Sequence, residues 1–219
     1  MVENTSAAPR RGRPPRFDAD HVVDAAIGAF FAKGFDATTL ADLEAATGVD
    51  RSTLYNSFGG KRGLYHKATE RYLDRAAESL FSVLYTGSDG TDGVGDDTDD
   101  GLQDVVQFLE RLRSGLTSAA VSPGCLIIND MAAGSDPDAA RRYRELLDNG
   151  LRAALGRAAK AGTIDSNTIE SRASLVSAAV VGINLVSRHT GDNQQVDQLV
   201  TGAITEVTSW RRHSEASAG

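Results

Sequence analysis

Apolar residues recur every three or four positions along almost the whole chain. This is the helical period, and no stretch alternates apolar and polar residues as a half-buried strand does. The first such helix is expected from about Asp18–Asp20 to Lys33, with an acidic N-cap and Gly34 as its stop. The pattern predicts an all-α protein.

Residues 39–61 predict two short helices joined by a tight turn at residues 47–49. Leu40, Leu43 and Ala46 share one side of the first helix. The second starts near Asp50, ends at 58–60, and turns Leu54 and Phe58 inward. A helix, a short glycine-containing turn and a second helix form the helix-turn-helix signature, although a free-standing αα-hairpin reads similarly.

The polar residues of the second helix favour DNA contact. Arg and Asn can bond base edges in the major groove, whereas hydroxyls and cations hold phosphates. We expect base contacts from Arg51, Ser52, Asn56 and Ser57, and phosphate contacts from Thr53, Tyr55 and Lys61.

A long helix is expected from about Lys61 to Leu84, followed by a Gly/Asp/Thr/Ser-rich segment that we expect to be disordered. Further helices are expected over 102–116, 125–133 and 168–188, and after Asn193. Another is expected from Asp136-Pro137 through Ala158, with Gly162 as its stop. The predicted organisation is a basic arm (1–16), a DNA-binding domain (17–63), a ligand-binding and dimerisation bundle (64–213, with a loop at 86–101) and a tail (214–219).

The 39–61 segment resembles the TetR family of bacterial transcriptional regulators. The family pattern T-x-x-D-[IL], a G-V turn and T-L-Y-x-x-F-x-x-K is matched at Thr39, Asp42, Leu43, Gly48, Val49, Thr53, Leu54, Tyr55, Phe58 and Lys61. The resemblance implies a three-helix DNA-binding domain joined by a long helix to a helical ligand-binding bundle, with the DNA contacts named above and Thr39. Glu44 and Gly59–Gly60 depart from the pattern: the Glu is expected to turn to solvent, and the Gly pair to loosen the turn.

The net charge of −7 is unevenly spread, with +1 over residues 1–69 and −8 over residues 70–219. Four arginines lie between residues 10 and 16, and the segment Arg11-Gly12-Arg13-Pro14 resembles an AT-hook core. Arg11 and Arg13 are therefore expected to reach a DNA backbone or minor groove; a solubilising tail is the alternative.

Between Leu175 and Val186 the chain is apolar on nearly every helical face. Such a helix must be buried all round, so we expect a homodimer through 168–188 and 194–210, as in the TetR family. A homodimer that binds double-stranded DNA through its two-fold symmetry implies a palindromic operator. The apolar run is too short to span a bilayer and no signal peptide is visible, so no membrane association and a cytoplasmic location are expected.

The resemblance also implies a small-molecule inducer bound inside the bundle. The candidate lining residues are Tyr72, Phe108, Met131, Tyr143 and Asn184. The single cysteine, Cys125, follows Pro-Gly as in a subset of the family that includes sensors of oxidants or electrophiles. A thiol near a helix N-terminus can have a lowered pKa, which makes redox sensing an alternative function.

Catalysis is not expected. The four histidines show no metal-ligand spacing, and no nucleophile elbow or CxxC motif is present. No cofactor or metal is predicted. The third alternative is a helical protein–protein adaptor without specific DNA binding.

Overall fold

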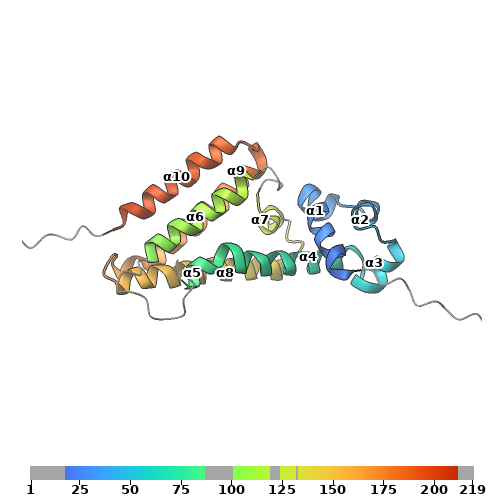
Figure 1. Ribbon diagram of the computed structural model, residues 1–219, viewed down its shortest axis with the longest axis horizontal. Coiled ribbons are helices and arrows are strands. Elements are labelled where there is room, and N and C mark those ends of the chain that lie inside the picture. Colours follow the sequence, from blue (N-terminus) through green and yellow to red (C-terminus); the bar gives the residue numbers. More distant parts are fainter. Residues whose placement is uncertain (1–17, 87–100, 119–123, 132, 212–219) are drawn as a thin grey trace, which may run out of the picture.

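The computed structural model describes residues 18–86, 101–118, 124–131 and 133–211 (Figure 1). Within these ranges nearly every residue is helical and no strand occurs, so the predicted all-α fold is confirmed. The elements are α1 (Ala19–Ala37), α2 (Leu40–Thr47), α3 (Arg51–Phe58), α4 (Gly60–Ala76), η1 (Ala77–Phe81), α5 (Ser82–Thr86), α6 (Gly101–Thr117), α7 (Leu126–Met131), α8 (Pro137–Lys160), η2 (Ser166–Thr168), α9 (Ile169–Thr190) and α10 (Asn193–Ser209).

We call α1, α2, α3 and the first half of α4 the head. They lie at one end of an elongated molecule (Figure 1). Its apolar cluster contains Phe30, Leu43, Leu54 and Leu64, and Leu126 of α7 joins it. Ala46, which we expected to face inward, is exposed. Thr47 is buried instead, and its hydroxyl donates to the Leu43 carbonyl oxygen (2.6 Å).

The predicted long helix after the head is continuous, but its backbone hydrogen-bonding pattern changes part-way along. Between α4 and α5 the backbone of η1 takes π-helical hydrogen bonding, which the sequence pattern did not reveal. Such insertions in α-helices occur mostly at functional sites. The helical path then continues to Thr86, two residues beyond the predicted end.

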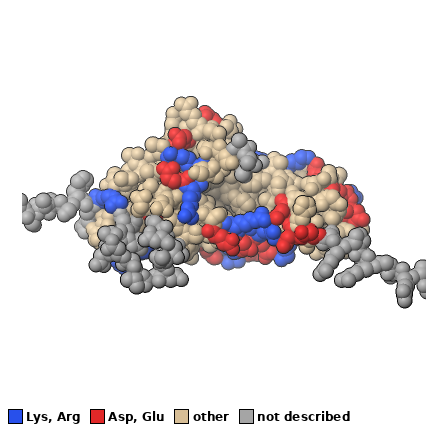
Figure 2. Space-filling model, viewed as in Figure 1, with Lys and Arg blue, Asp and Glu red and all other residues tan. Residues whose placement is uncertain are grey.

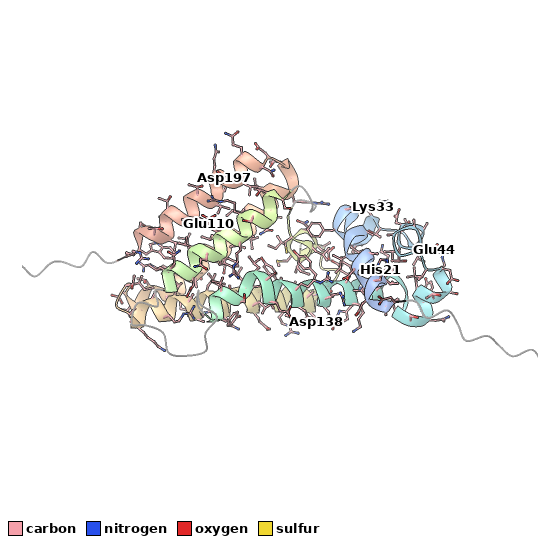
Figure 3. The ribbon with its side chains drawn as sticks, viewed as in Figure 1. His21, Lys33, Glu44, Glu110, Asp138 and Asp197 are labelled. Carbon is pink, nitrogen blue, oxygen red and sulfur yellow. The ribbon has the colours of Figure 1, made fainter. Side chains whose placement is uncertain are left out.

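We call the remaining helices, from η1 to α10, the body. In Figure 1, α8 lies alongside the α4–α5 helix, while α6 and α10 run side by side above them. Its core stacks Phe81 against Phe108 (ring centroids 5.7 Å apart) and sets Tyr143 edge-on to Phe81 (5.6 Å). On the far side of α6, Arg113 bridges Glu110 and Asp197, which lie close together in Figure 3 (3.5 and 3.4 Å).

Several helix ends follow the sequence signals. Asp18 caps α1, and Gly34 breaks its helical path with φ = 77°, before a last short turn to Ala37. Asp136 caps α8. The cap of α10 is Asp192 and not Asn193, which is the first helical residue. Thr86 and Gly101 belong to helices, and the remaining residues of the expected acidic loop, 87–100, lie outside the described ranges.

Candidate nucleic-acid interface

The start of α3 is fixed by side chains from two helices. Asp50 is its N-cap and accepts from the Thr53 backbone N–H (2.7 Å) and the Ser52 hydroxyl (2.8 Å). These bonds lower the pKa of Asp50, so it is ionised at neutral pH. Glu44 of α2 accepts from the Arg51 backbone N–H (2.7 Å). Glu44 therefore does more than turn to solvent: it satisfies a free N–H group of the recognition helix.

The end of α3 is fixed by two glycines with positive φ. Gly59 closes α3 at φ = 77°, and Gly60 follows at φ = 82°. A Cβ on Gly60 would lie 2.8 Å from Cε1 of Tyr55, so the tyrosine ring packs against this glycine. The Gly pair is thus not a loose turn, because only glycine allows both the backbone path and the close ring.

Most polar side chains of α3 project from the head. Arg51, Ser52, Asn56 and Ser57 are exposed, Tyr55 is 55% exposed and Thr53 is half-buried. On the opposite face Leu54 is fully buried. The hydroxyl of Tyr55 and the polar groups of Asn56 and Ser57 make no side-chain hydrogen bond to the described residues, so they are free to bond another molecule.

Two of the expected DNA contacts already have partners. The Thr39 hydroxyl donates to Asp42 (2.8 Å) and accepts from the Asp42 backbone N–H (3.1 Å). The Thr39 backbone N–H donates in turn to the Asp42 carboxylate (2.9 Å), which completes the capping box of α2. The Lys61 ammonium donates to the Asp36 carbonyl oxygen (3.1 Å) and lies 4.5 Å from the centroid of the Phe35 ring. Each side chain would have to share or exchange these partners to bind a phosphate.

The electrostatics of the folded head alone do not favour DNA. Residues 18–69 hold five Lys/Arg against seven Asp/Glu, whereas residues 1–17 hold four Arg against one Glu. Arg11 and Arg13 belong to this N-terminal segment, which lies outside the described residues. The positive excess of residues 1–69 therefore comes from the segment before α1.

Comparison with known proteins decides the family. Residues 22–68 match the model of bacterial regulatory proteins of the tetR family. These residues, which make up the head, belong to the TetR family. This confirms the resemblance seen in residues 39–61.

Two relatives of this chain are named as HTH-type transcriptional repressors of Escherichia coli (strain K12). ComR is 32% identical over 120 residues, which is 55% of this chain and 52% of ComR. BdcR is 36% identical over 73 residues, or 33% of this chain and 37% of BdcR. The matched segments thus span about half of ComR and just over a third of BdcR.

The TetR fold extends over most of the chain. A cysteine mutant of the TetR family regulator CifR, complexed with 26-bp double-strand operator DNA, superposes with a TM-score of 0.73 at 23% identity. The match covers 88% of this chain and 98% of that one. At this identity, the likeness establishes the shared fold.

A cavity of about 400 Å³ lies beside η1, where the body meets α4 and Phe31 of α1. It brings together Tyr72, Tyr143 and Asn184 from α4, α8 and α9, three of the five residues that we expected to bind a ligand. Phe108 and Met131 do not line it. Phe108 is fully buried, stacked on Phe81, and Met131 packs against the body core. The sequence analysis missed Ser79 and Leu80, two residues of the π-helical η1 that form part of the cavity wall.

Cys125 also lines this cavity, but its thiol is not activated. Burial raises the pKa of the thiol, and hydrogen bonds from Tyr72 and from the backbone of Ile128 and Ile127 only partly oppose this. The expected lowering of the pKa is therefore wrong, because desolvation outweighs the donors at the start of the six-residue α7. The thiol is held in its protonated, less reactive form.

The outer face of α9 and α10 is apolar and uncovered in the single chain. Leu175, Leu185 and Leu199 are 51%, 40% and 40% exposed. A shallow groove of about 380 Å³ runs between the two helices, lined by Leu175, Ala179, Gly182, Ile183, Val186, Leu199, Gly202, Ala203 and Glu206. The all-round burial expected of 175–186 is therefore not reached within one copy.

Among the described residues, one helical stretch, Ser166–Thr190, is long and apolar enough to cross a membrane by length and composition. The apolar run from Leu175 to Val186 is the central part of this longer stretch. The same helix buries Ala173, Val176 and Val180 in the body core. Core helices of water-soluble proteins pass this test as well, so the stretch is weak evidence for a membrane.

Proposed function

We propose that this chain is a transcriptional regulator that binds a specific double-stranded DNA operator through α3. The observation that carries the proposal is the exposed row Tyr55, Asn56 and Ser57, on a helix held at both ends by the head itself. A helix that enters the major groove needs polar groups free of internal partners along its outer face. The membership of the TetR family supports the same function.

In this proposal each polar residue has a role. The base edges are read by Arg51, Ser52, Asn56 and Ser57. The phosphates are held by Thr53 and Tyr55, with Thr39 and Lys61 exchanging their present partners for phosphate oxygens. Arg11 and Arg13 supply positive charge in the backbone or minor groove, which the folded head lacks.

The regulator is proposed to act as a homodimer. The exposed leucines of α9 and α10 form an apolar surface of a kind that monomers rarely leave in water. A second copy packed on this face would bury both sets of leucines around a two-fold axis. Two heads would then meet half-sites about one helical turn apart, which requires a palindromic operator.

The cavity supports control by a small molecule. Its wall includes η1, which continues α4 directly, and a single residue, Gly59, separates α4 from the end of α3. A ligand that shifts η1 can therefore change the position of the recognition helix. We propose a repressor that a small-molecule inducer releases from its operator, in keeping with the names of ComR and BdcR. The proposal places the protein in the cytoplasm and gives it no catalytic activity.

Selection of bound sequences from random duplex DNA tests this function. The unaltered protein is expected to enrich a palindrome, and Tyr55→Phe is expected to weaken binding to it by about 10- to 100-fold. That variant keeps the ring against Gly60 and removes only the hydroxyl, whose bond to a charged group contributes about 1.5–3 kcal/mol. Tyr85→Phe, at the exposed tyrosine of the body, is the matched control and should bind normally. Enrichment of no sequence would point instead to the protein–protein adaptor.

A further inference from the structure

One of the residues that line the cavity, Asn184, carries a polar atom without a partner. Asn184 is 1% exposed, and its Nδ2 donates to the Val180 carbonyl oxygen (2.8 Å). Its Oδ1 is buried and has no hydrogen-bond partner among the described residues. A buried acceptor left without a donor costs about 1–3 kcal/mol, so the site favours a ligand that brings a donor to this oxygen.

The rim of the same cavity holds a cation that no carboxylate neutralises. Arg111 of α6 is exposed, and its Nη1 donates to the Ser79 carbonyl oxygen (2.9 Å) and the Ser82 hydroxyl (3.2 Å). Both acceptors are uncharged, and no ion pair joins Arg111 to a described Asp or Glu. Arg75, the other basic lining residue, is paired with Asp24 (2.8 Å).

Between these two points the wall is mainly apolar. Phe31, Leu80 and Leu112 contribute hydrocarbon, and the rings of Tyr72 and Tyr143 complete it. No Asp or Glu among the described residues lines the cavity. Figure 2 shows this face of the molecule hollowed between the head and the body, with basic and acidic side chains side by side near the hollow.

These features together point to one class of ligand. We propose that the cavity binds a compact organic acid with an apolar or aromatic body and a hydrogen-bond donor, such as a hydroxyl, at the end away from the acid group. The carboxylate lies at Arg111, and the donor lies at Oδ1 of Asn184. The inference rests on the small-molecule control proposed above and specifies its ligand.

The proposal selects against two other classes. An organic cation would meet the guanidinium of Arg111 and no compensating carboxylate on the described part of the wall. A purely apolar ligand would leave the buried Oδ1 of Asn184 without a donor. The volume of about 400 Å³ is at the lower end of the ~300–1,000 Å³ of small-molecule sites, so the body of the ligand is short.

Calorimetric titration of the full-length protein tests the ligand class directly. The probes are 4-hydroxyphenyl alkanoic acids with side chains of graded length, each compared with its uncharged primary amide and with the acid lacking the ring hydroxyl. We expect at least one hydroxy acid to bind, and to bind about tenfold or more tightly than either comparator, as charge-assisted and buried hydrogen bonds require. An amide that binds as tightly as its acid would overturn the role of Arg111.

Two substitutions assign the contacts. Arg111→Gln should abolish the preference for acid over amide, and Asn184→Leu should abolish the preference for the hydroxylated acid. Arg113→Gln, two residues along α6 and paired with Glu110 and Asp197 away from the cavity, is the control and should bind as the unaltered protein does. If Asn184→Leu fails to fold, the comparison of hydroxylated and unhydroxylated acids on the unaltered protein still decides the role of Asn184.

DNA binding is measured separately, without any acid present. Binding of none of the acids, with Tyr55-dependent DNA binding intact, would refute this ligand class and leave the regulatory function standing. Acid binding with the predicted preferences, but without DNA binding, would support the ligand class and refute the regulator. Acid binding that also lowers operator affinity would support both.

Discussion

The head and the body differ in how completely their buried polar side chains are hydrogen-bonded. In the head, side chains close the starts of α1, α2 and α3, and no described buried side-chain atom lacks a hydrogen-bond partner. In the body, Oδ1 of Asn184 and the side-chain amide of Asn129 are buried without partners among the described residues, and a cavity lies against the π-helical η1. The buried polar side-chain atoms of the head, which we propose to contact DNA, are thus all hydrogen-bonded, whereas the part that we propose to respond to a ligand has unpaired buried atoms and a cavity.

The largest effect should follow from removing a core side chain of the head. Leu54→Ala deletes a fully buried side chain and should lower the stability of the head by about 2–5 kcal/mol, with loss of DNA binding. Trp210 is the single tryptophan and packs in the body core, so its fluorescence reports unfolding of the body. Far-UV circular dichroism follows all helices.

In Leu54→Ala we expect an early helical transition that Trp210 fluorescence does not follow. Coincident shifts of both signals would show that the head and the body unfold as one unit. The difference in hydrogen bonding between them would then not extend to their stability. Tyr55→Phe, on the exposed face of the same helix, should leave both transitions unchanged.

The second largest effect should come from the charge of the N-terminal segment. Replacing Arg10, Arg11, Arg13 and Arg16 by Gln leaves a head with excess negative charge, so operator affinity should fall by on the order of tenfold or more. The slope of log affinity against log salt should become shallower by about 0.9 for each phosphate that the segment no longer neutralises.

Lys at the same four positions serves as the control, because it keeps the charge but not the shape of the guanidinium. Full recovery with Lys would indicate phosphate contact alone, whereas failure to recover would indicate a minor-groove role. An unchanged salt slope in the Gln variant would contradict any role of the segment in DNA binding.

Much of the head could be predicted from the sequence because its signals are local. Asp18, Gly48, Asp50 and Gly59 mark helix ends through bonds to neighbouring residues or through positive φ. Glu44 was missed as a partner of α3, because its bond to Arg51 depends on the angle between two helices. Local periodicity carries no information about that angle.

The body was less predictable because its site depends on packing over long distances. Tyr72, Tyr143 and Asn184 come from three helices, and only their packing brings them to one cavity. The π-helical turn has no marker in the apolar pattern, and Arg111 was not considered because nothing local separates it from Arg113. The pKa of Cys125 was misjudged for the same reason, since desolvation is set by the whole body.

A smaller effect is expected at the junction of α4 and α8. The Asp136 carboxylate caps α8 through the Ala139 N–H (3.0 Å) and also accepts from Thr69 of α4 (2.7 Å). Asp136→Ala should lower stability by about 0.5–2 kcal/mol in chemical denaturation. Asp136→Asn, which can still cap the helix, should lose less.

The pH dependence of stability distinguishes the contribution of the Asp136 charge from the contribution of its helix cap. Burial raises the pKa of Asp136, but bonds from Ala139, Thr69 and His66 outweigh it and lower the pKa below its ordinary value. The stabilisation is therefore present above the unfolded-state pKa of about 3.9 and is lost as pH falls through the lower folded-state pKa. Asp136→Asn should lose this component of the acid sensitivity; an unchanged acid profile would contradict the assignment.

The smallest effect is expected at an exposed link between the same two helices. Arg142 of α8 donates to Asp74 of α4 (2.7 Å), but their side chains are 43% and 60% exposed. Water and salt screen such pairs, so a double-mutant cycle with Arg142→Met and Asp74→Asn should give a coupling energy below about 1 kcal/mol that shrinks in high salt. A coupling above about 2 kcal/mol that persists in salt would mean that the pair is shielded in the working assembly. The junction of α4 and α8 would then be rigid. Any movement of α4 that a bound ligand causes would have to arise in η1.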